Sequence, residues 1–416
     1  ITVGLFGLVG DGAARITPAV SPASFTPAQE AAADAVETLQ ALGVDIIIGL
    51  SHSGGGDDAP EGEDEAIAAA VDGIDVIVSG HSHTALQEAR VVNDTVIVQA
   101  GAYTRYVGEL TVVRDDAGGW SLDGYTLHEL DDTIAGDPEV TAMVDGFVTA
   151  LDEGPLAELG TTFSEPIFHI DADIGVNACE ESTLGNFVTD AFRHTLNTYS
   201  PADPIVAAFE SQGVIRDDLL AGSTGIESFS DVFRVMPLGV GTDDVPGYGL
   251  VSFYVTPKDL KSTCEILGSI VPIEGCEFWV EPSGIRCHVD PDRSLGNTAR
   301  QVDLLVDGDW VELDSSDDTT LYHVAVDSYV AGLMNILAGL TFDAIIIEPK
   351  LADGTVVEDI DSLTFDKDPA TEGIQEVKLW EALVTYGESF GDTDGDGIPD
   401  IGDSYSVPEG RIIILD

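Results

Sequence analysis

The chain of 416 residues is 44% hydrophobic and carries 76 Asp and Glu against 16 Lys and Arg, a formal net charge of −60. This surplus of negative charge repels phosphate, which excludes charge-driven binding to nucleic acid or to anionic membranes. The length allows two or three domains, and no apolar run approaches the ~18 residues of a membrane-spanning helix.

Self-repulsion on this scale is usually screened by salt or by bound divalent cations. The composition therefore predicts a secreted or periplasmic protein from a saline or calcium-rich setting, with an acidic secreted protein of a GC-rich genome as the alternative. The four cysteines suit an oxidising compartment, and the last three lie close enough in sequence for one bridge. They are Cys179, Cys264, Cys276 and Cys287. The oligomeric state stays open at this point.

Up to about residue 130 the pattern alternates strands and helices. Thr26-Pro27-Ala28-Gln29 predicts a capping box with Pro at the first helical position, for a helix that ends at Leu42 before Gly43. A stretch rich in Gly and Asp, 54–63, predicts an exposed loop. The other elements expected here are a helix over 64–71, strands over 44–50, 75–79, 95–99 and 108–114, and a hairpin turn over 115–119 before Trp120. This order predicts a mixed, layered α/β sheet.

One long helix is predicted from Pro138 to Leu159, because apolar residues recur there at helical spacing. The helix lies between two regions of different pattern, so we expect it to link two domains. The alternative is a packing helix of the second domain. Its apolar positions are Val140, Met143, Val144, Phe147, Val148 and Leu151.

Two histidine-bearing turns form the first candidate site. Ser51-His52-Ser53-Gly54 and Gly80-His81-Ser82-His83 each follow a short apolar run that is typical of a buried parallel strand. Ligands bind where such strands end, and neutral imidazole is a preferred ligand for zinc, iron and manganese. The pattern predicts that His52, His81 and His83 contribute to a divalent-metal site. Three solvated loop histidines are the alternative.

These turns, together with Val98-Gln99-Ala100-Gly101, resemble the second half of a calcineurin-like metallophosphoesterase domain, in the version found in the 5′-nucleotidase/UDP-sugar hydrolase family. The resemblance implies that His52 and His81 ligate one metal and His83 the other. The family's earlier Asp-x-His, bridging Asp and Gly-Asn-His motifs do not occur, and 1–7 resembles a strand from the middle of that domain. Two metals need roughly eight ligands, so we expect a complete site to require residues upstream of Ile1.

A second set of motifs resembles the C-terminal domain of the same family. The stretch 181–192 begins with a cap and continues as an amphipathic helix, and it is followed by 209–216, 283–286 and 408–412. The resemblance implies three segments along the chain. They are the C-terminal half of a metallophosphoesterase domain over 1–135, a linker helix over 136–164, and an α+β substrate-binding domain over 165–416.

The resemblance also implies substrate-binding residues. Arg216 follows Gly213, and its planar guanidinium suits phosphate or carboxylate oxygens; an ion pair with Asp217 or Asp218 is the alternative. Ser211 stands where the family has Asn. Relatives hold a base between two aromatic rings, but here Leu238 replaces one ring and the stretch 331–336 lacks the other. Because base stacking is worth roughly 1–3 kcal/mol per ring, weak nucleoside binding is predicted.

Residues 392–403 predict a calcium-binding loop. Carboxylates stand at loop positions 1, 3, 5, 9 and 12 with Gly at 6, which is the spacing that wraps oxygens around one Ca²⁺. The loop resembles the Asp-rich calcium loops of thrombospondin type 3 repeats, and a solvated acidic turn is the alternative. It lies between a final helix predicted over 377–386 and a closing strand at 410–412, so a structural clip is expected. The expected ligands are Asp392, Asp394, Asp396, Asp400, Asp403 and the carbonyl of Ile398.

Taken together, the motifs predict a metal-dependent phosphoesterase that hydrolyses a phosphate monoester of a nucleotide or related small molecule, with two divalent ions such as Zn²⁺ or Mn²⁺. One alternative is a non-catalytic, calcium-stabilised extracellular binding module or degenerate family member. Another is an enzyme acting on a non-nucleotide ester, an idea that rests on Leu238 and Ile336.

Overall fold

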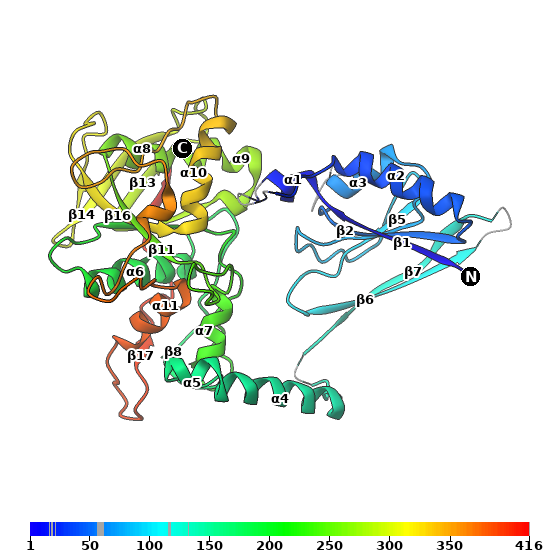
Figure 1. Ribbon diagram of the computed structural model, residues 1–416, viewed down its shortest axis with the longest axis horizontal. Coiled ribbons are helices and arrows are strands. Elements are labelled where there is room, and N and C mark those ends of the chain that lie inside the picture. Colours follow the sequence, from blue (N-terminus) through cyan, green and yellow to red (C-terminus); the bar gives the residue numbers. More distant parts are fainter. Residues whose placement is uncertain are drawn as a thin grey trace. The chain divides into compact units, whose positions relative to one another are not determined.

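The computed structural model describes residues 1–416 apart from 16, 18, 19, 21, 56–61, 115–117, 132 and 416. These residues fold into two compact units, Ile1–Thr141 and Ala142–Asp416, which we call the N-terminal unit and the C-terminal unit (Figure 1). The division falls inside the segment 136–164. The centre of the predicted 54–63 loop and most of the predicted turn over 115–119 lie outside the described residues.

The N-terminal unit is built around a five-stranded sheet in the order β1-β2-β3-β5-β4 (Figure 1). The first four of these strands run parallel, and β4 pairs antiparallel with β5 at the edge. Their bounds are β1 Val3–Val9, β2 Ile46–His52, β3 Val76–Val78, β4 Arg90–Val92 and β5 Thr95–Val98. Strand β4 was not predicted from the sequence, and it is only three residues long.

Each face of this sheet packs against a different layer. On one face lie the helices, where Ala32 and Ile67 contact Ile47 and Ile77. The other face packs against an antiparallel hairpin through Trp120 and neighbouring apolar residues. The helices of this layer are α2 Ala28–Ala41 and α3 Glu63–Ala70, and the hairpin is β6 Tyr106–Arg114 with β7 Trp120–Glu129. A short helix, α1 Asp11–Arg15, follows β1.

The expected capping box at Thr26 is wrong. Pro27 is the N-cap of α2, and no side chain of its own segment caps the helix. Instead Asp11, from α1, accepts a hydrogen bond from the backbone N–H of Ala28 at 3.0 Å. The cap thus comes from a residue 17 positions earlier, which local sequence cannot reveal.

The single helix expected over 138–159 is two helices, α4 Pro138–Glu153 and α5 Pro155–Leu159. Pro155 has no N–H to donate and clashes with the preceding turn, so the helix breaks at Gly154. No residue of α4 is buried. In α5 only Leu156 is buried, and the linker role of 136–164 stays a prediction.

The C-terminal unit holds three sheets and their helices. The central sheet has the order β11-β16-β9-β12, and one core lies on each of its faces: Ala208 and Leu250 point into one, Ala207 and Val251 into the other. This alternation follows from the two-residue period of a strand. The central strands are β9 Ala207–Ser211, β11 Leu250–Val255, β12 Val280–Ser283 and β16 Tyr322–Asp327.

The other two sheets have the orders β15-β14-β13-β18 and β10-β8-β17. Their strands are β13 Ile285–Val289, β14 Ala299–Val306, β15 Asp309–Glu312 and β18 Ile412–Ile414, and then β8 Pro166–Ile170, β10 Ile226–Ser228 and β17 Asp400–Gly402. The helices are α6 Thr183–Tyr199, α7 Phe229–Val235, α8 Pro257–Ser269, α9 Val271–Glu274, α10 Ser328–Leu340 and α11 Leu379–Glu388, with short 3₁₀ turns η1 Cys276–Phe278 and η2 Ile360–Leu363. No helix of the described residues is both long and apolar enough to cross a membrane.

All four cysteines are paired, as Cys179–Cys276 and Cys264–Cys287. The second bridge lies within the segment where one was expected. The first joins residues 97 positions apart, a pairing that sequence spacing did not indicate.

Candidate metal and substrate sites

The two histidine turns meet at one edge of the N-terminal sheet. His52 is the last residue of β2, His81 follows the neighbouring parallel strand β3, and their ring centroids lie 4.9 Å apart at 54°. Gly54, at φ 87°, lies so close to the second turn that a Cβ there would be 3.0 Å from Ser82 Cβ. The sequence therefore places both imidazoles together, because parallel strands end at the same edge.

The third histidine lies to the side of this pair. The ring of His83 meets the ring of Tyr103 edge-on, with centroids 5.3 Å apart. Both His81 (φ 77°) and His83 (φ 57°) have left-handed backbone conformations, which a residue with a Cβ adopts only at a cost in free energy. The surrounding structure must hold this turn in place.

Two imidazoles at a strand edge fit part of the coordination shell of a divalent transition metal, because nitrogen donors suit such ions. In the described parts of the chain, three potential ligand atoms lie within 4.8 Å of one another only in the group Asp392, Asp394 and Asp400. His52 and His81 therefore supply two donors, and His83 does not complete a three-donor group with them.

The strand-turn before Arg216 is held by backbone contacts. Ser211 ends β9, and its hydroxyl donates to the carbonyl of Glu277. Gly213 lies against the same residue, where a Cβ would come within 2.9 Å of Glu277 Cβ. Arg216 Nη1 donates to the Gly213 carbonyl at 3.0 Å, so the guanidinium is folded over its own turn.

Asp217 and Asp218, the alternative ion-pair partners predicted for Arg216, each contact another residue. An oxygen of Asp217 lies 3.4 Å from Arg234 Nε, and Asp218 accepts a hydrogen bond from the backbone of Val176 at 3.0 Å.

A buried carboxylate also anchors this turn. Glu281 accepts hydrogen bonds from Gln212 Nε2 at 2.8 Å and from the Ser182 hydroxyl at 2.7 Å. Burial raises the pKa of Glu281 to about 7, although these donors lower it in part. Gly185 is required beside it, since any side chain there would overlap Glu281. The carboxylate ties the cap of α6 to the turn that carries Arg216.

Near Leu238 two tyrosine rings stack on each other. Leu238 is half-buried against the core, and its carbonyl accepts from the N–H of Tyr248 at 2.8 Å. The Tyr248 ring stacks on Tyr329 with centroids 5.5 Å apart at 22°. Because the two rings contact each other, no base fits between them. The stretch 331–336 lies in α10, and the side chain of Asn335 is outside the described residues.

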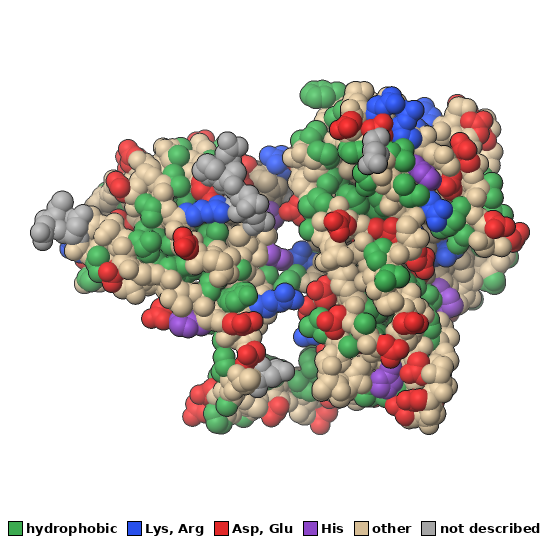
Figure 2. Space-filling model, turned by 180° about the vertical axis from the view of Figure 1, so that it is seen from behind, with side chains coloured by type: hydrophobic (Ala, Val, Ile, Leu, Met, Phe, Trp, Pro, Cys, Tyr) green, Lys and Arg blue, Asp and Glu red, His purple; other side chains and the backbone are tan. Residues whose placement is uncertain are grey.

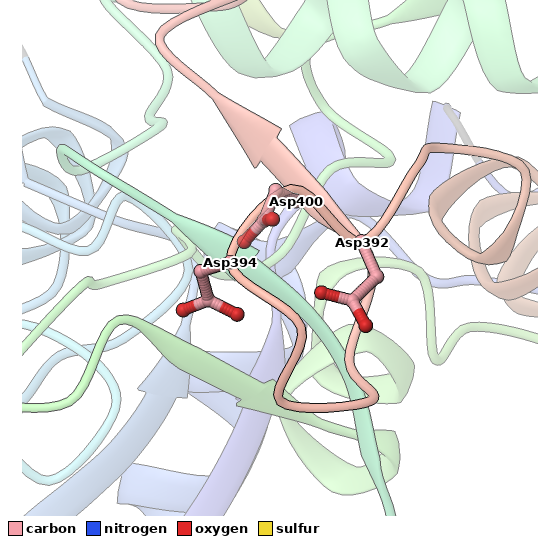
Figure 3. A group of neighbouring side chains, drawn as sticks. All are labelled: Asp392, Asp394 and Asp400. Carbon is pink, nitrogen blue, oxygen red and sulfur yellow. The ribbon is translucent and has the colours of Figure 1, made fainter.

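In the predicted calcium loop, three of the expected ligands gather and others do not. Asp392, Asp394 and Asp400 form the group noted above (Figure 3). Asp396 turns away, with Oδ2 at 3.1 Å from His169 Nε2, and Asp403 is outside the group. The Ile398 N–H donates to Asp396 at 2.9 Å. Asp392 accepts from the backbone of Gly395 and Gly397, at 2.6 and 3.0 Å, which shapes the loop.

Several known proteins are similar to this chain in sequence or in structure. Residues 159–338 match the family model described as the 5′-nucleotidase C-terminal domain. The trifunctional nucleotide phosphoesterase protein YfkN of Bacillus subtilis is 28% identical over 335 residues, which are 79% of this chain and 21% of that protein. Human 5′-nucleotidase is 28% identical over 233 residues, 50% of this chain and 38% of that protein. The chain thus spans well under half the length of these relatives.

Solved structures share the fold. A 5′-nucleotidase precursor from Thermus thermophilus has a TM-score of 0.67 at 22% identity, covering 100% of this chain and 72% of that one. The sulfate thiohydrolase SoxB of the same organism has a TM-score of 0.64 at 18% identity, covering 99% and 63%. The predicted fold class, a partial metallophosphoesterase-like layer followed by an α+β C-terminal domain, and the predicted family resemblance are confirmed.

Proposed function

We propose that this chain, which carries a 5′-nucleotidase C-terminal domain and has the fold of the 5′-nucleotidase family, serves the metal-dependent hydrolysis of a phosphate monoester. The observation that carries the proposal is the convergence of the His52 and His81 rings at 4.9 Å. These two residues would hold one divalent ion such as Zn²⁺ or Mn²⁺, and His83 a second. Such an ion polarises a phosphate ester and activates water for attack on phosphorus.

Residues of the C-terminal unit would bind the substrate. The planar guanidinium of Arg216 matches the oxygens of a phosphate or carboxylate. The Ser211 and Gly213 contacts with Glu277 fix the turn that presents it. The hydrogen bond from Arg216 Nη1 to the Gly213 carbonyl holds the guanidinium over this turn, and we assign it the role of receiving and orienting the anionic group of the ester.

The fold does not determine which organic group the substrate ester carries, because one fold can host several chemistries. The relatives are named for nucleotides, whereas one structural neighbour is named a sulfate thiohydrolase. Here Leu238 and the Tyr248–Tyr329 stack replace a base sandwich. These residues support an ester whose organic group is not a nucleoside as the second candidate substrate.

Replacing His81 by alanine is expected to weaken Zn²⁺ binding by about tenfold or more, since changes even outside the ligand shell cost that much. Titration calorimetry measures the affinity. His128→Ala is the matched control, because His128 is an exposed histidine of the same unit, paired with Glu109 at 2.8 Å. The same variants are assayed on an aryl phosphate and on AMP with Mn²⁺ or Zn²⁺.

Equal Zn²⁺ affinity of the wild-type chain and His81→Ala would remove the metal centre from the proposal. Metal binding without turnover of either ester would favour the non-catalytic binding module instead. Turnover of the aryl phosphate without AMP hydrolysis would favour the non-nucleotide substrate.

We also propose that the loop 392–403 binds Ca²⁺ as a structural clip. The support is the spacing of its carboxylates together with the gathering of Asp392, Asp394 and Asp400. The loop leads from α11 into β17, which pairs with β8. A cation there would neutralise carboxylates that otherwise repel one another and would tie the loop to the sheet.

Calcium is therefore expected to raise the melting temperature of the C-terminal unit. A ligand a hundredfold above its Kd stabilises by about 2.7 kcal/mol, which corresponds to roughly 5–10 °C for a unit of this size. Differential scanning calorimetry with CaCl₂ and with EGTA measures the shift. Asp394→Asn should abolish it, whereas Asp353→Asn, an exposed Asp that caps its own turn at Thr355, should retain it. An equal melting temperature in CaCl₂ and EGTA would exclude the clip.

The location outside the cytoplasm is likewise a proposal. Two disulfides persist only in an oxidising compartment in most organisms. Acidic side chains outnumber basic ones on the visible face of the C-terminal unit (Figure 2), which suits screening by salt or divalent cations. These features support a secreted or periplasmic protein in a saline setting.

A further inference from the structure

We propose that Gln99 is a positioning residue of the histidine site: its side-chain amide holds the turn 80–84 in the shape that brings the His81 ring to His52. The inference rests on the metal-binding part of the proposed function. It concerns a residue to which the family resemblance assigned no role.

The turn needs such support because its backbone is strained. His81 and His83 both have positive φ, at 77° and 57°. Residues in this region persist only when neighbouring groups over-determine the conformation. The hydrogen bond from Ser82 N to Gly80 O, at 3.0 Å, lies within the turn itself and cannot fix the turn relative to the sheet.

Gln99 makes contacts on both sides of the strained residues. It follows β5 and is 2% exposed. With its amide oriented so that the oxygen faces donors, Oε1 accepts from the N–H groups of His83 and Thr84 at 3.1 and 3.0 Å. Nε2 donates to the hydroxyls of Ser79 and Ser82 at 3.1 and 3.0 Å. The Gln99 side chain therefore contacts Ser79 before the turn, Ser82 in the middle of the turn, and the backbone at its end.

The backbone of Gln99 is fixed as well. Its carbonyl accepts from the N–H of Leu86 at 3.1 Å and from the Tyr125 hydroxyl at 3.0 Å. Tyr125 belongs to the hairpin layer on one face of the sheet. The amide is therefore anchored on a rigid platform, as positioning of a strained turn requires.

The strand that carries His52 has a buried contact of its own. Ser51 and Ser53 are both buried, and the Ser51 hydroxyl donates to Ser53 Oγ at 2.8 Å. His52 stands between these two serines, so its backbone is fixed on the side of the first turn.

Amide hydrogen exchange in the metal-free, ¹⁵N-labelled full chain tests the inference. In Gln99→Met the N–H groups of His83 and Thr84 should exchange about tenfold faster or more, and Zn²⁺ affinity should fall about tenfold or more. Gln99→Glu keeps an acceptor oxygen, so the two amides should stay protected, which a purely space-filling role would not predict. Gln87→Met, at an exposed glutamine of the same unit whose Nε2 donates only locally to Ala85 O, is the control and should match wild type.

Unchanged exchange at both amides in Gln99→Met would overturn the inference. Should that variant fail to fold, Ser82→Ala removes one partner of the amide at an exposed position, and faster exchange at His83 and Thr84 is again expected; unchanged exchange there would overturn it. If the wild-type chain binds no Zn²⁺, the proposed metal function fails, while the exchange rates still decide whether Gln99 holds the turn.

Discussion

Removing the Cys179–Cys276 bridge is expected to lower the free energy of unfolding of the C-terminal unit by about 4.7 kcal/mol. Crosslinking stabilises mainly by restricting the unfolded chain, and this bridge closes a loop of 97 residues. The Cys264–Cys287 bridge closes only 23 residues, for which the same relation gives about 3.4 kcal/mol. The longer loop should therefore cost more, even though Cys264 and Cys287 are the more deeply buried pair.

Two double variants test this order, one with both Cys179 and Cys276 replaced by alanine and one with both Cys264 and Cys287 replaced by alanine. Alanine is chosen over serine because it buries no unpaired hydroxyl group. Urea unfolding followed by circular dichroism measures both free energies under identical conditions. An equal loss for the two bridges, or a larger loss for Cys264–Cys287, would mean that packing rather than loop closure dominates.

The same bridge lies beside the turn that carries Arg216. The N–H of Cys179 donates to Gln212 Oε1 at 3.2 Å, and Cys276 precedes Glu277, whose carbonyl accepts from Ser211 and Gly213. The disulfide therefore clamps both walls of the turn that carries Arg216. We expect its loss to weaken phosphate binding as well as stability.

The sequence predicted the features that depend on neighbouring residues. The apolar runs before His52 and His81 identified two parallel strands, and parallel strands end at the same edge, so the meeting of the two rings was foreseeable. The cap of α6 is likewise local: Ser182 Oγ accepts from the N–H of Gly185 at 3.0 Å. The break at Pro155 also has a local cause, because proline lacks the N–H that a continuous helix needs, but one continuous helix was predicted there.

Features built from distant residues were not predictable in this way. Gln99 is a polar residue at the end of a strand, and its role depends on where Ser79, Ser82 and Thr84 come to lie. The cap of α2 by Asp11 and the partner of Cys179 depend equally on the tertiary fold. The motifs around Asp190, Ser283 and Arg411 were identified one by one, but their meeting at a single point was not.

The contact between Arg411 and Asp190 leads to the second prediction: Arg411→Met is expected to destabilise the C-terminal unit by about 3–5 kcal/mol. Arg411 is 4% exposed, and its Nη2 lies 2.6 Å from an oxygen of Asp190 on α6. Its Nη1 donates to the Pro282 carbonyl on β12 at 3.1 Å. Removing the guanidinium leaves the buried Asp190 carboxylate with only the more distant Arg193, at 3.7 Å, as a counter-charge, which costs more than the lost hydrogen bonds alone.

Two comparisons separate this cause from loss of packing. Asp190→Asn in the Arg411→Met background should recover part of the loss, because no buried charge then remains unpaired. Arg293→Met is the matched surface control: Arg293 is half-exposed and pairs with Asp290 at 2.9 Å, and exposed pairs contribute about 0–1 kcal/mol. Equal losses for Arg411→Met and Arg293→Met would contradict the argument.

The pH dependence provides an independent check. Burial raises the pKa of Asp190, but Arg411, Ser283 and Arg193 together more than offset this and hold it below the ordinary value of 3.8. A carboxylate with a lowered pKa contributes stability that is present above 3.8 and is lost as the pH falls through its folded-state pKa. The difference in unfolding free energy between wild type and Arg411→Met should therefore be largest near neutral pH. It should shrink as the pH falls, first where Asp190 of the variant, without Arg411, takes up a proton, and then down through the lowered folded-state pKa of Asp190 in wild type. A difference that does not change with pH would assign the loss to packing of the arginine side chain rather than to its charge.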